Sequence, residues 1–410
     1  MLVAEVRCSG RLHLLRAPLA HRGRKFCAVV AVALAVAASV AAPARAIVIE
    51  LPYAGAPLPP PVMAGLLASA DLATSTLESF FSDPVILHFK IETTAALPPT
   101  VFGYFDVHPS VTSAISYGDV AAALAADATS AADAMAVSSL QPVGALSMIT
   151  NDTTAAPSLR MHVDDPFVYN TTLRLTRANQ KALGLLPGAD DAGIGIGADG
   201  TIVLNAGVFP LMDFDPSDGI DPGKFDMTAI LMHEMLHGMG FIGGVDHIDY
   251  SSSDGFFSAP GHPHDYSGEA IFTVLDLYRY SEESVTFPDQ PATGAVLDWA
   301  AGTSPIFGDN PYFSIDAGAT SLALFSTGPE FGDGYQAQHW KDEGFFFGPP
   351  FGLMDPDIGP AELGMLTPLD ILAMDVIGWT LIPEPSSMVL TASGPLLMVL
   401  VLARRRRRRR

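Results

Sequence analysis

Cysteine is the residue type that this 410-residue chain contains least often. There are only two, Cys8 and Cys27, and both lie near the N-terminus. If residues 1–46 are removed, as argued below, the remaining chain has no thiol and no disulfide. Its stability must then come from a hydrophobic core and from bound groups. Cys27 also precedes the apolar run of that N-terminal stretch, which argues against a lipoprotein anchor.

Basic residues are scarce in the body of the chain. Seven of the 22 Lys and Arg residues lie in 1–46 and seven in 404–410, so removal of residues 1–46 and 382–410 leaves eight basic against 42 acidic residues. A balance of −34 excludes nucleic acid and anionic membrane surfaces as natural partners. It suits an extracellular protein, and it is compatible with calcium ions bound among clustered Asp side chains.

The N-terminal 46 residues combine a basic stretch, an apolar run from Phe26 to Pro43 and the small-residue sequence Ala44-Arg45-Ala46. This order is typical of a secretory signal peptide, and we expect cleavage after Ala46. A membrane anchor is the alternative, but the run is short and rich in Ala and Val. The sequence therefore predicts export.

The C-terminal residues 382–410 have three parts in a defined order. Pro383-Glu384-Pro385 precedes an apolar run from Met388 to Ala403, and seven arginines end the chain. An apolar run of this length followed by positive charge predicts a membrane segment with the arginines on the cytoplasmic side. The tail resembles the PEP-CTERM sorting signal of Gram-negative-type bacteria. That resemblance implies an exosortase-type partner, transient membrane anchoring, and a final location in the cell envelope or outside the cell.

The strongest motif is His233-Glu234-x-x-His237, in an apolar stretch that ends at Gly238 and Gly240. Residues four apart on a helix lie on one face, so both imidazoles can reach one metal ion. Zinc needs neutral imidazoles, an open coordination position and a base near its water, and Glu234 is the expected base. The alternative is a buried helix with two core histidines, which would leave Glu234 as an unpaired carboxylate.

The third metal ligand is not set by this motif. A continuation to a third His in the same stretch would place it at position 243, which is Gly. A Glu on a later helix is a second possibility, and a distant His is the third. The candidates are Asp246, His247, Glu269, Glu282, Glu283 and His339.

Three motifs in order carry a resemblance. The His-Glu motif continues through Gly240, His339-Trp340 follows much later, and Leu353-Met354-x-Pro comes fifteen residues after that His. Together with Asp375-x-x-Gly-Trp379, this arrangement resembles the leishmanolysin-like branch of metzincin metalloproteases, including those with PEP-CTERM tails. The resemblance implies His233, His237 and His339 as zinc ligands, Glu234 as the base, and Met354 as the residue of the Met-turn. The eukaryotic relatives are rich in disulfides, and this chain is not.

Periodicity predicts local elements along residues 47–381. Helices are expected over 62–82, from 117 towards 135, and over 177–183. Strands are expected over 85–92, 160–163 and 200–205, and the last is expected to form the sheet edge on which substrate lies. The acidic residues 213–226 do not match an EF-hand, so we favour a turn-rich loop over a calcium site.

These observations predict an α+β, two-lobed, metzincin-like zinc protease with a twisted mixed sheet, an active-site helix and a loop-rich C-terminal lobe. Its expected parts are a catalytic lobe, 47–242, and a lobe with the third ligand and the Met-turn, 243–381. The expected activity is a secreted zinc endopeptidase that hydrolyses polypeptides. The rival is a catalytically inactive envelope or matrix protein on the same fold.

Overall fold

The part of the chain that can be described in detail extends from residue 47 to residue 383. The computed structural model describes residues 47–106, 112–154, 159–186, 197–252, 264–291, 294–303, 310–345 and 349–383. Arg45–Ile382 form one compact unit. Within the described ranges, no helix has the length and apolar character needed to cross a membrane. The expected leader 1–46, the apolar run 388–403, and Glu384 and Pro385 of the sorting motif lie outside these ranges.

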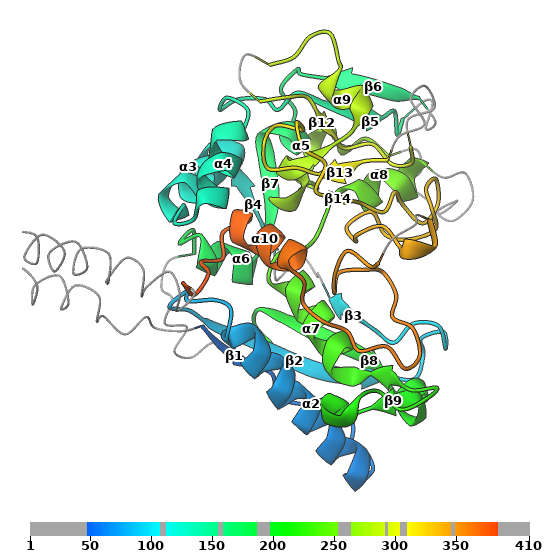
Figure 1. Ribbon diagram of the computed structural model, residues 1–410. Helices are drawn as coiled ribbons and strands as arrows, with labels where there is room; N and C mark the ends of the chain where they lie inside the picture. The colour runs from blue at the N-terminus through cyan, green and yellow to red at the C-terminus, as the bar shows by residue number, and fades with distance from the viewer. Residues whose placement is uncertain are drawn as a thin grey trace, which may run out of the picture. The chain divides into compact units, whose positions relative to one another are not determined.

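A four-stranded mixed sheet is formed by strands from residues 48–106 and 200–205 (Figure 1). Its order is β1 (Val48–Glu50), β2 (Ile86–Thr94), β8 (Gly200–Asn205) and β3 (Gly103–Asp106). The first three strands run parallel, and β3 runs antiparallel to β8. Alternate side chains of β2, such as Phe89 and Ile91, are fully buried, as expected for a strand whose one face is covered by helices.

The expectation that residues 200–205 form the sheet edge is wrong. β8 lies between β2 and β3, so β3 is the edge strand. Gly200 has a φ of +151°, and a Cβ atom there would lie 1.9 Å from the ring of Phe105 on β3. Because Gly200 has no side chain, β3 can pair with β8 at this point. The short strand β3, which contains Tyr104 and Phe105, therefore forms the edge of the sheet.

Two helices cover this sheet. α2 (Pro60–Glu78) packs beside β1, and α7 (Met227–Gly238) packs against α2, β3 and β8. α7 begins at Asp226, whose Oδ1 accepts the backbone N–H of Ala229 at 3.0 Å. The helix is terminated just beyond Gly238 by Gly240, which has a φ of +117°. The next residue, Phe241, donates its backbone N–H to the Leu236 carbonyl. This left-handed glycine stop is the one that the sequence predicts.

Other local expectations are confirmed with shifted ends. β2, β6 (Arg160–Val163), α2 and α6 (Arg177–Ala182) occur where periodicity places them. The expected long Ala-rich helix is instead two helices, α3 (Tyr117–Asp127) and α4 (Ala131–Ser139). Ser130 caps α4 in a reciprocal pair with Asp133, so a Ser-x-x-Asp capping box restarts the helix inside the alanine run.

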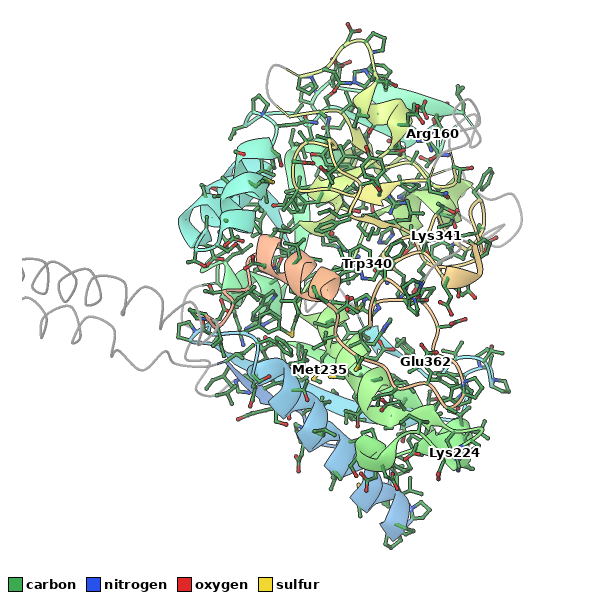
Figure 2. The ribbon with its side chains drawn as sticks, viewed as in Figure 1. Arg160, Lys224, Met235, Trp340, Lys341 and Glu362 are labelled. Atoms are coloured by element: carbon green, nitrogen blue, oxygen red, sulfur yellow. The ribbon has the colours of Figure 1, made fainter. Side chains whose placement is uncertain are left out.

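Several small sheets and short helices make up the rest of the molecule, which confirms the α+β class. β5 (Met148–Asn151) pairs with β6 on one side and with β12 (Leu297–Asp298) on the other. Residues from before and after position 243 therefore share one sheet. Arg160 on β6, labelled in Figure 2, links this sheet to α9 (Glu282–Val285). Its guanidinium forms ion pairs with Asp298 on β12 at 2.6 Å and with Glu283 on α9 at 2.9 Å.

The remaining short elements connect these layers. The strands are β4 (Thr112–Ser116), β7 (Thr172–Thr176), β9 (Met212–Asp213), β10 (Phe225–Asp226), β11 (Arg279–Tyr280), β13 (Tyr312–Phe313) and β14 (Ala323–Leu324). The helices are α5 (Val168–Thr171), α8 (Val245–Ser252) and α10 (Pro368–Val376), and the 3₁₀ turns are η2 (Ala206–Leu211), η3 (Pro216–Asp218), η4 (Tyr266–Gly268), η5 (Leu275–Tyr278) and η6 (Glu343–Phe345).

Candidate metal centre

α7 presents two of the expected site residues on one face. His233 and His237 are one helical turn apart, and their Nε2 atoms lie 3.1 Å from each other. Glu234 lies beside them on the same helix and is only 7% exposed. Nearly every side chain of α7 is buried, so this polar group of three residues is embedded in an apolar helix, as the motif predicts.

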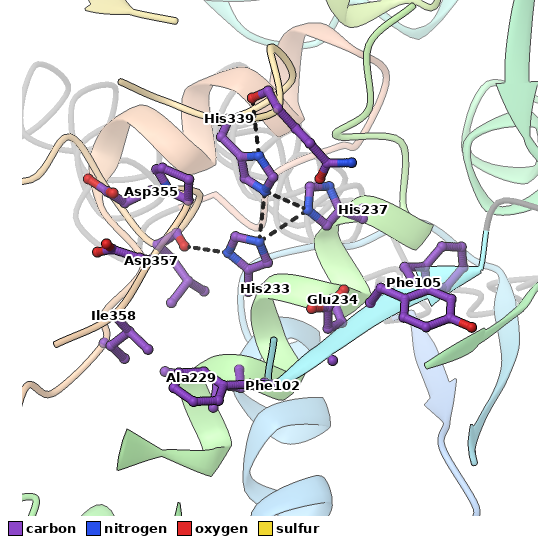
Figure 3. A pocket seen from close by; sticks show the side chains of 18 of the residues that line it. Phe102, Phe105, Ala229, His233, Glu234, His237, His339, Asp355, Asp357 and Ile358 are labelled. Atoms are coloured by element: carbon purple, nitrogen blue, oxygen red, sulfur yellow. Dashed lines mark hydrogen bonds between the residues drawn. The ribbon is translucent and has the colours of Figure 1, made fainter. Parts of the chain in front are cut away.

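His339 arrives from a loop far along the chain. Its Nε2 lies 3.1 Å from Nε2 of His233 and 3.1 Å from Nε2 of His237 (Figure 3). The segment is held by backbone pairing, because Ser326 N–H donates to the His339 carbonyl and Lys341 N–H donates to the Leu324 carbonyl. Of the six candidates for a third ligand, His339 is the one that the fold brings to the two helix histidines.

The second ring nitrogens show what the three histidines can bind. Nδ1 of His233 contacts the Leu353 carbonyl at 2.8 Å, Nδ1 of His237 contacts the Phe241 carbonyl at 2.6 Å, and Nδ1 of His339 contacts the Gln336 carbonyl at 3.3 Å. A carbonyl only accepts, so each Nδ1 must carry the hydrogen. In the neutral rings, all three Nε2 atoms are then bare acceptors that face one another.

Burial keeps these rings neutral. It lowers the pKa of His237 to about 3, with a further contribution from His233. It also lowers the pKa of His233 and takes that of His339 well below its usual value. Three converging lone pairs repel each other unless a cation lies between them. Ligands about 2.0–2.1 Å from a tetrahedral zinc are about 3.3 Å apart, close to the observed triangle, so the group fits a metal ion.

Glu234 and the histidines line a cavity of about 850 Å³. Its walls are the β3 segment 100–106, the start of α7, and residues 352–367 (Figure 3). Burial raises the pKa of Glu234 to about 8, and the backbone of Phe105 on β3 opposes that shift. Among the described strands, β3 pairs only with β8, and residues 100–106 line the cavity beside Glu234.

Met354 lies behind the histidines and is fully buried. Its carbonyl accepts the Trp340 N–H at 2.9 Å, so it is joined to the residue after His339. The preceding carbonyl, that of Leu353, holds Nδ1 of His233. The segment that the sequence singled out as a turn thus contacts His233 on the helix and Trp340, the residue that follows His339.

The other candidates for a third ligand have different partners. His247 lies beside Tyr266, with ring centroids 6.1 Å apart. Glu269 bonds His264 at 2.6 Å, and Glu283 bonds Arg160. Asp246 on α8 accepts the backbone N–H of Ala337 at 2.6 Å. Asp246 therefore holds the loop that carries His339, but it is not one of the residues that meet His233 and His237.

Asp370 is a site residue that sequence reasoning missed. It is fully buried on α10 and accepts the Leu353 N–H at 2.8 Å, the Met354 N–H at 3.2 Å and the Trp340 indole N–H at 2.8 Å. Figure 2 shows Trp340 beside α10. The only local sequence signal is Thr367-x-x-Asp370, a capping box. A capping box predicts the start of a helix, and it does not predict hydrogen bonds to Leu353 and Met354.

The acidic stretch 213–226 folds as the turn-rich loop that we favoured. Asp213 accepts the backbone N–H groups of Asp215 at 3.0 Å and Asp221 at 2.8 Å. Its carboxylate is therefore used to hold the loop.

Comparisons with family models, with curated proteins and with solved structures find no match to this chain, so its function must be argued from the geometry of the site.

Proposed function

We propose that the protein is a zinc-dependent endopeptidase with a metzincin-like site, in which His233, His237 and His339 hold the metal. The observation that carries this proposal is the set of three bare Nε2 atoms 3.1 Å apart with a buried carboxylate beside them. When bound, zinc supplies Lewis acidity that activates water and polarises a carbonyl.

Glu234 is the proposed general base. It takes a proton from the attacking water and passes it to the leaving amine. Burial raises the pKa of Glu234, which makes its carboxylate a stronger proton acceptor than an exposed glutamate. The carbonyls of Leu353, Phe241 and Gln336 fix the neutral ring tautomers and leave each Nε2 lone pair available to the metal.

β3 is the proposed substrate platform. Among the described strands β3 pairs only with β8, and residues 100–106 line the cavity next to Glu234, so an extended peptide can add to this edge strand through backbone hydrogen bonds. A substrate bound in this way presents a peptide carbonyl to the metal group. Recognition through the backbone suits a polypeptide substrate and favours an endopeptidase over a hydrolase of small molecules.

The test is hydrolysis of casein by the purified full-length chain. We expect activity that a chelator abolishes and zinc restores. Glu234→Gln should retain one zinc ion per chain and lose at least a thousandfold in turnover, since the amide keeps the shape but cannot accept a proton. Glu269→Gln, at a half-exposed glutamate paired with His264, is the matched control and should keep full activity.

Either of two results would count against the proposal. Wild-type turnover in Glu234→Gln would remove the base from the mechanism. A wild-type chain that holds zinc but cleaves no polypeptide would favour the inactive envelope or matrix protein.

Export and sorting are also proposed, from residues 1–46 and 382–410 alone. If the tail is a sorting address, deletion of residues 383–410 should release an active protein to the medium while the intact chain stays in the envelope fraction. Immunoblots of the two fractions distinguish these outcomes. Retention of the truncated, folded chain in the envelope would contradict the sorting role.

A further inference from the structure

Three aspartates meet beside the cavity but apart from the histidine group. Oxygen atoms of Asp342, Asp355 and Asp357 all lie within 4.8 Å of one another. Asp342 follows the His339 segment and precedes η6, while the other two follow Met354. The backbone bond from Trp340 N–H to the Met354 carbonyl brings these two segments together. The cluster therefore joins the loop that carries His339 to the segment that contains Met354.

Asp355 is the unusual member of the cluster. It is only 5% exposed, and neither carboxylate oxygen has a hydrogen-bond partner or contact with solvent. The other two are partly satisfied, since Asp342 Oδ1 accepts the Gly344 N–H at 2.7 Å and Asp357 Oδ2 accepts the Tyr335 hydroxyl at 3.2 Å. An ionised carboxylate that is buried without a partner is strongly destabilising, so a charged Asp355 requires a positive group beside it.

No side chain of the described residues supplies that charge. Lys341, which is next to Asp342 in sequence and is labelled in Figure 2, bonds Asp333 at 2.8 Å. Both of those side chains are buried. The other lysines and arginines with ion pairs in the described ranges have different acidic partners. Burial, followed by the carboxylates of Glu343, Asp342 and Asp357, raises the pKa of Asp355 to about 9. The backbone of Asp357 opposes this shift but makes no hydrogen bond of normal geometry.

We infer that Asp342, Asp355 and Asp357 form a second cation site, selective for calcium, that ties the His339 loop to the Met354 turn. Calcium binds carboxylate oxygens at about 2.3–2.6 Å, so two ligands of one ion lie up to about 5 Å apart, which matches the observed spread. An all-oxygen site disfavours zinc. The ligands come from irregular loops, which suit the flexible coordination of calcium better than the strict octahedron of magnesium.

A basic side chain of a substrate is the competing occupant, because Asp355 and Asp357 also line the cavity (Figure 3). The oxygens of Asp355 have no solvent-accessible surface. An ammonium or guanidinium group that enters through the cavity therefore does not reach them, whereas a bare ion seated between the carboxylates does. The geometry thus favours a metal ion over a specificity pocket.

The test is calcium binding to the purified full-length chain, stripped of metals and reloaded with one equivalent of zinc. Isothermal titration calorimetry should show one calcium ion bound per wild-type chain. Asp355→Asn and the exposed Asp357→Asn should each weaken binding by roughly tenfold or more, because calcium affinity depends on the charge of its ligands. Asp218→Asn, the same change at an exposed aspartate in the 213–226 loop, should bind as wild type does.

Thermal unfolding gives a second measurement. The difference in melting temperature between Asp355→Asn and wild type should change sign when calcium is added. Without calcium and above about pH 9, where all three carboxylates are charged, Asp355→Asn should melt above wild type, because it removes one of three repelling charges. With millimolar calcium, wild type should rise and Asp355→Asn should not. If Asp355→Asn fails to fold, Asp357→Asn decides the question.

The inference is overturned if wild type neither binds calcium nor gains stability from it, or if both cluster variants bind as wild type does. It is also overturned if the variants lose only the cleavage of peptides with basic residues while wild type binds no calcium. Because calcium binding is measured without substrate, a chain with no peptidase activity leaves this test intact.

Discussion

Hydrogen bonds to three backbone carbonyls decide what His233, His237 and His339 can bind. Each carbonyl accepts a hydrogen bond from Nδ1–H and leaves the Nε2 lone pair free, which is the tautomer that a metal requires. Two of the carbonyls, those of Phe241 and Gln336, are on the same segment as the histidine they hold. The third belongs to Leu353, so the ring of His233 is oriented by a distant loop.

His339→Ala should lower zinc affinity by at least a hundredfold, because two protein ligands remain where three are needed. His247→Ala and Glu269→Ala should keep one zinc per chain, since the structure pairs both residues elsewhere. Elemental analysis after dialysis measures the zinc content, and circular dichroism confirms folding. A zinc-loaded His339→Ala beside a zinc-free His247→Ala would move the third ligand to the stretch that follows α7.

At the scale of elements, α10 supports the site from behind. Asp370, in the first turn of that helix, accepts hydrogen bonds from Leu353, Met354 and Trp340. These residues adjoin the carbonyl that holds His233 and the loop that carries His339. Asp370 touches no metal-binding nitrogen, so it is a positioning residue.

Asp370→Asn should destabilise the fold and weaken zinc binding together. The amide replaces one acceptor oxygen by a donor, which leaves buried N–H groups unpaired at a cost of about 3 kcal/mol. Urea unfolding of the zinc-free chain gives the stability change, and competition with a chelator gives the zinc affinity. Asp71→Asn, at an exposed position on α2, is the control and should change neither. Loss of stability with unchanged zinc affinity would show that α10 supports the fold only.

At the scale of the whole molecule, a buried aspartate, Asp83, joins an early segment of the folded unit to its last segment. Asp83, between α2 and β2, accepts the Thr380 N–H at 3.0 Å, which joins the first helix to the segment after α10. Burial, with Asp127 nearby, raises the pKa of Asp83 to about 7. Burial likewise raises the pKa of Asp127 and that of Asp375 to about 6.

These shifts predict a stability that falls as the pH rises. A carboxyl whose pKa is higher in the folded state binds its proton more tightly there, so its stabilising contribution is complete below about pH 4 and is lost as the pH rises to about 7. Asp83→Asn should therefore gain stability relative to wild type as the pH rises through that range, by about 4 kcal/mol in full. Urea unfolding at a series of pH values measures the difference. A difference independent of pH would show that Asp83 titrates normally.

The sequence by itself determined the features that depend on neighbouring residues. Four-residue spacing placed His233 and His237 on one face of α7, and glycine ended that helix where expected. Alternating or periodic apolar residues located β2, β6, β8, α2 and α6. Local geometry is the same wherever a segment lies, so spacing alone was sufficient for these elements. The resemblance to a known family is what selected His339 and Met354 among open alternatives.

Only the tertiary structure decided which distant residues meet. His339 lies 102 residues beyond His237, and the loops between them carry no periodic signal that fixes its distance from α7. The edge position of β3, the hydrogen bonds of Asp370 and the meeting of Asp342 with Asp355 depend on the same kind of long-range packing. Such contacts are set by how elements pack and where backbone groups find partners, and the order of residues along the chain does not specify them.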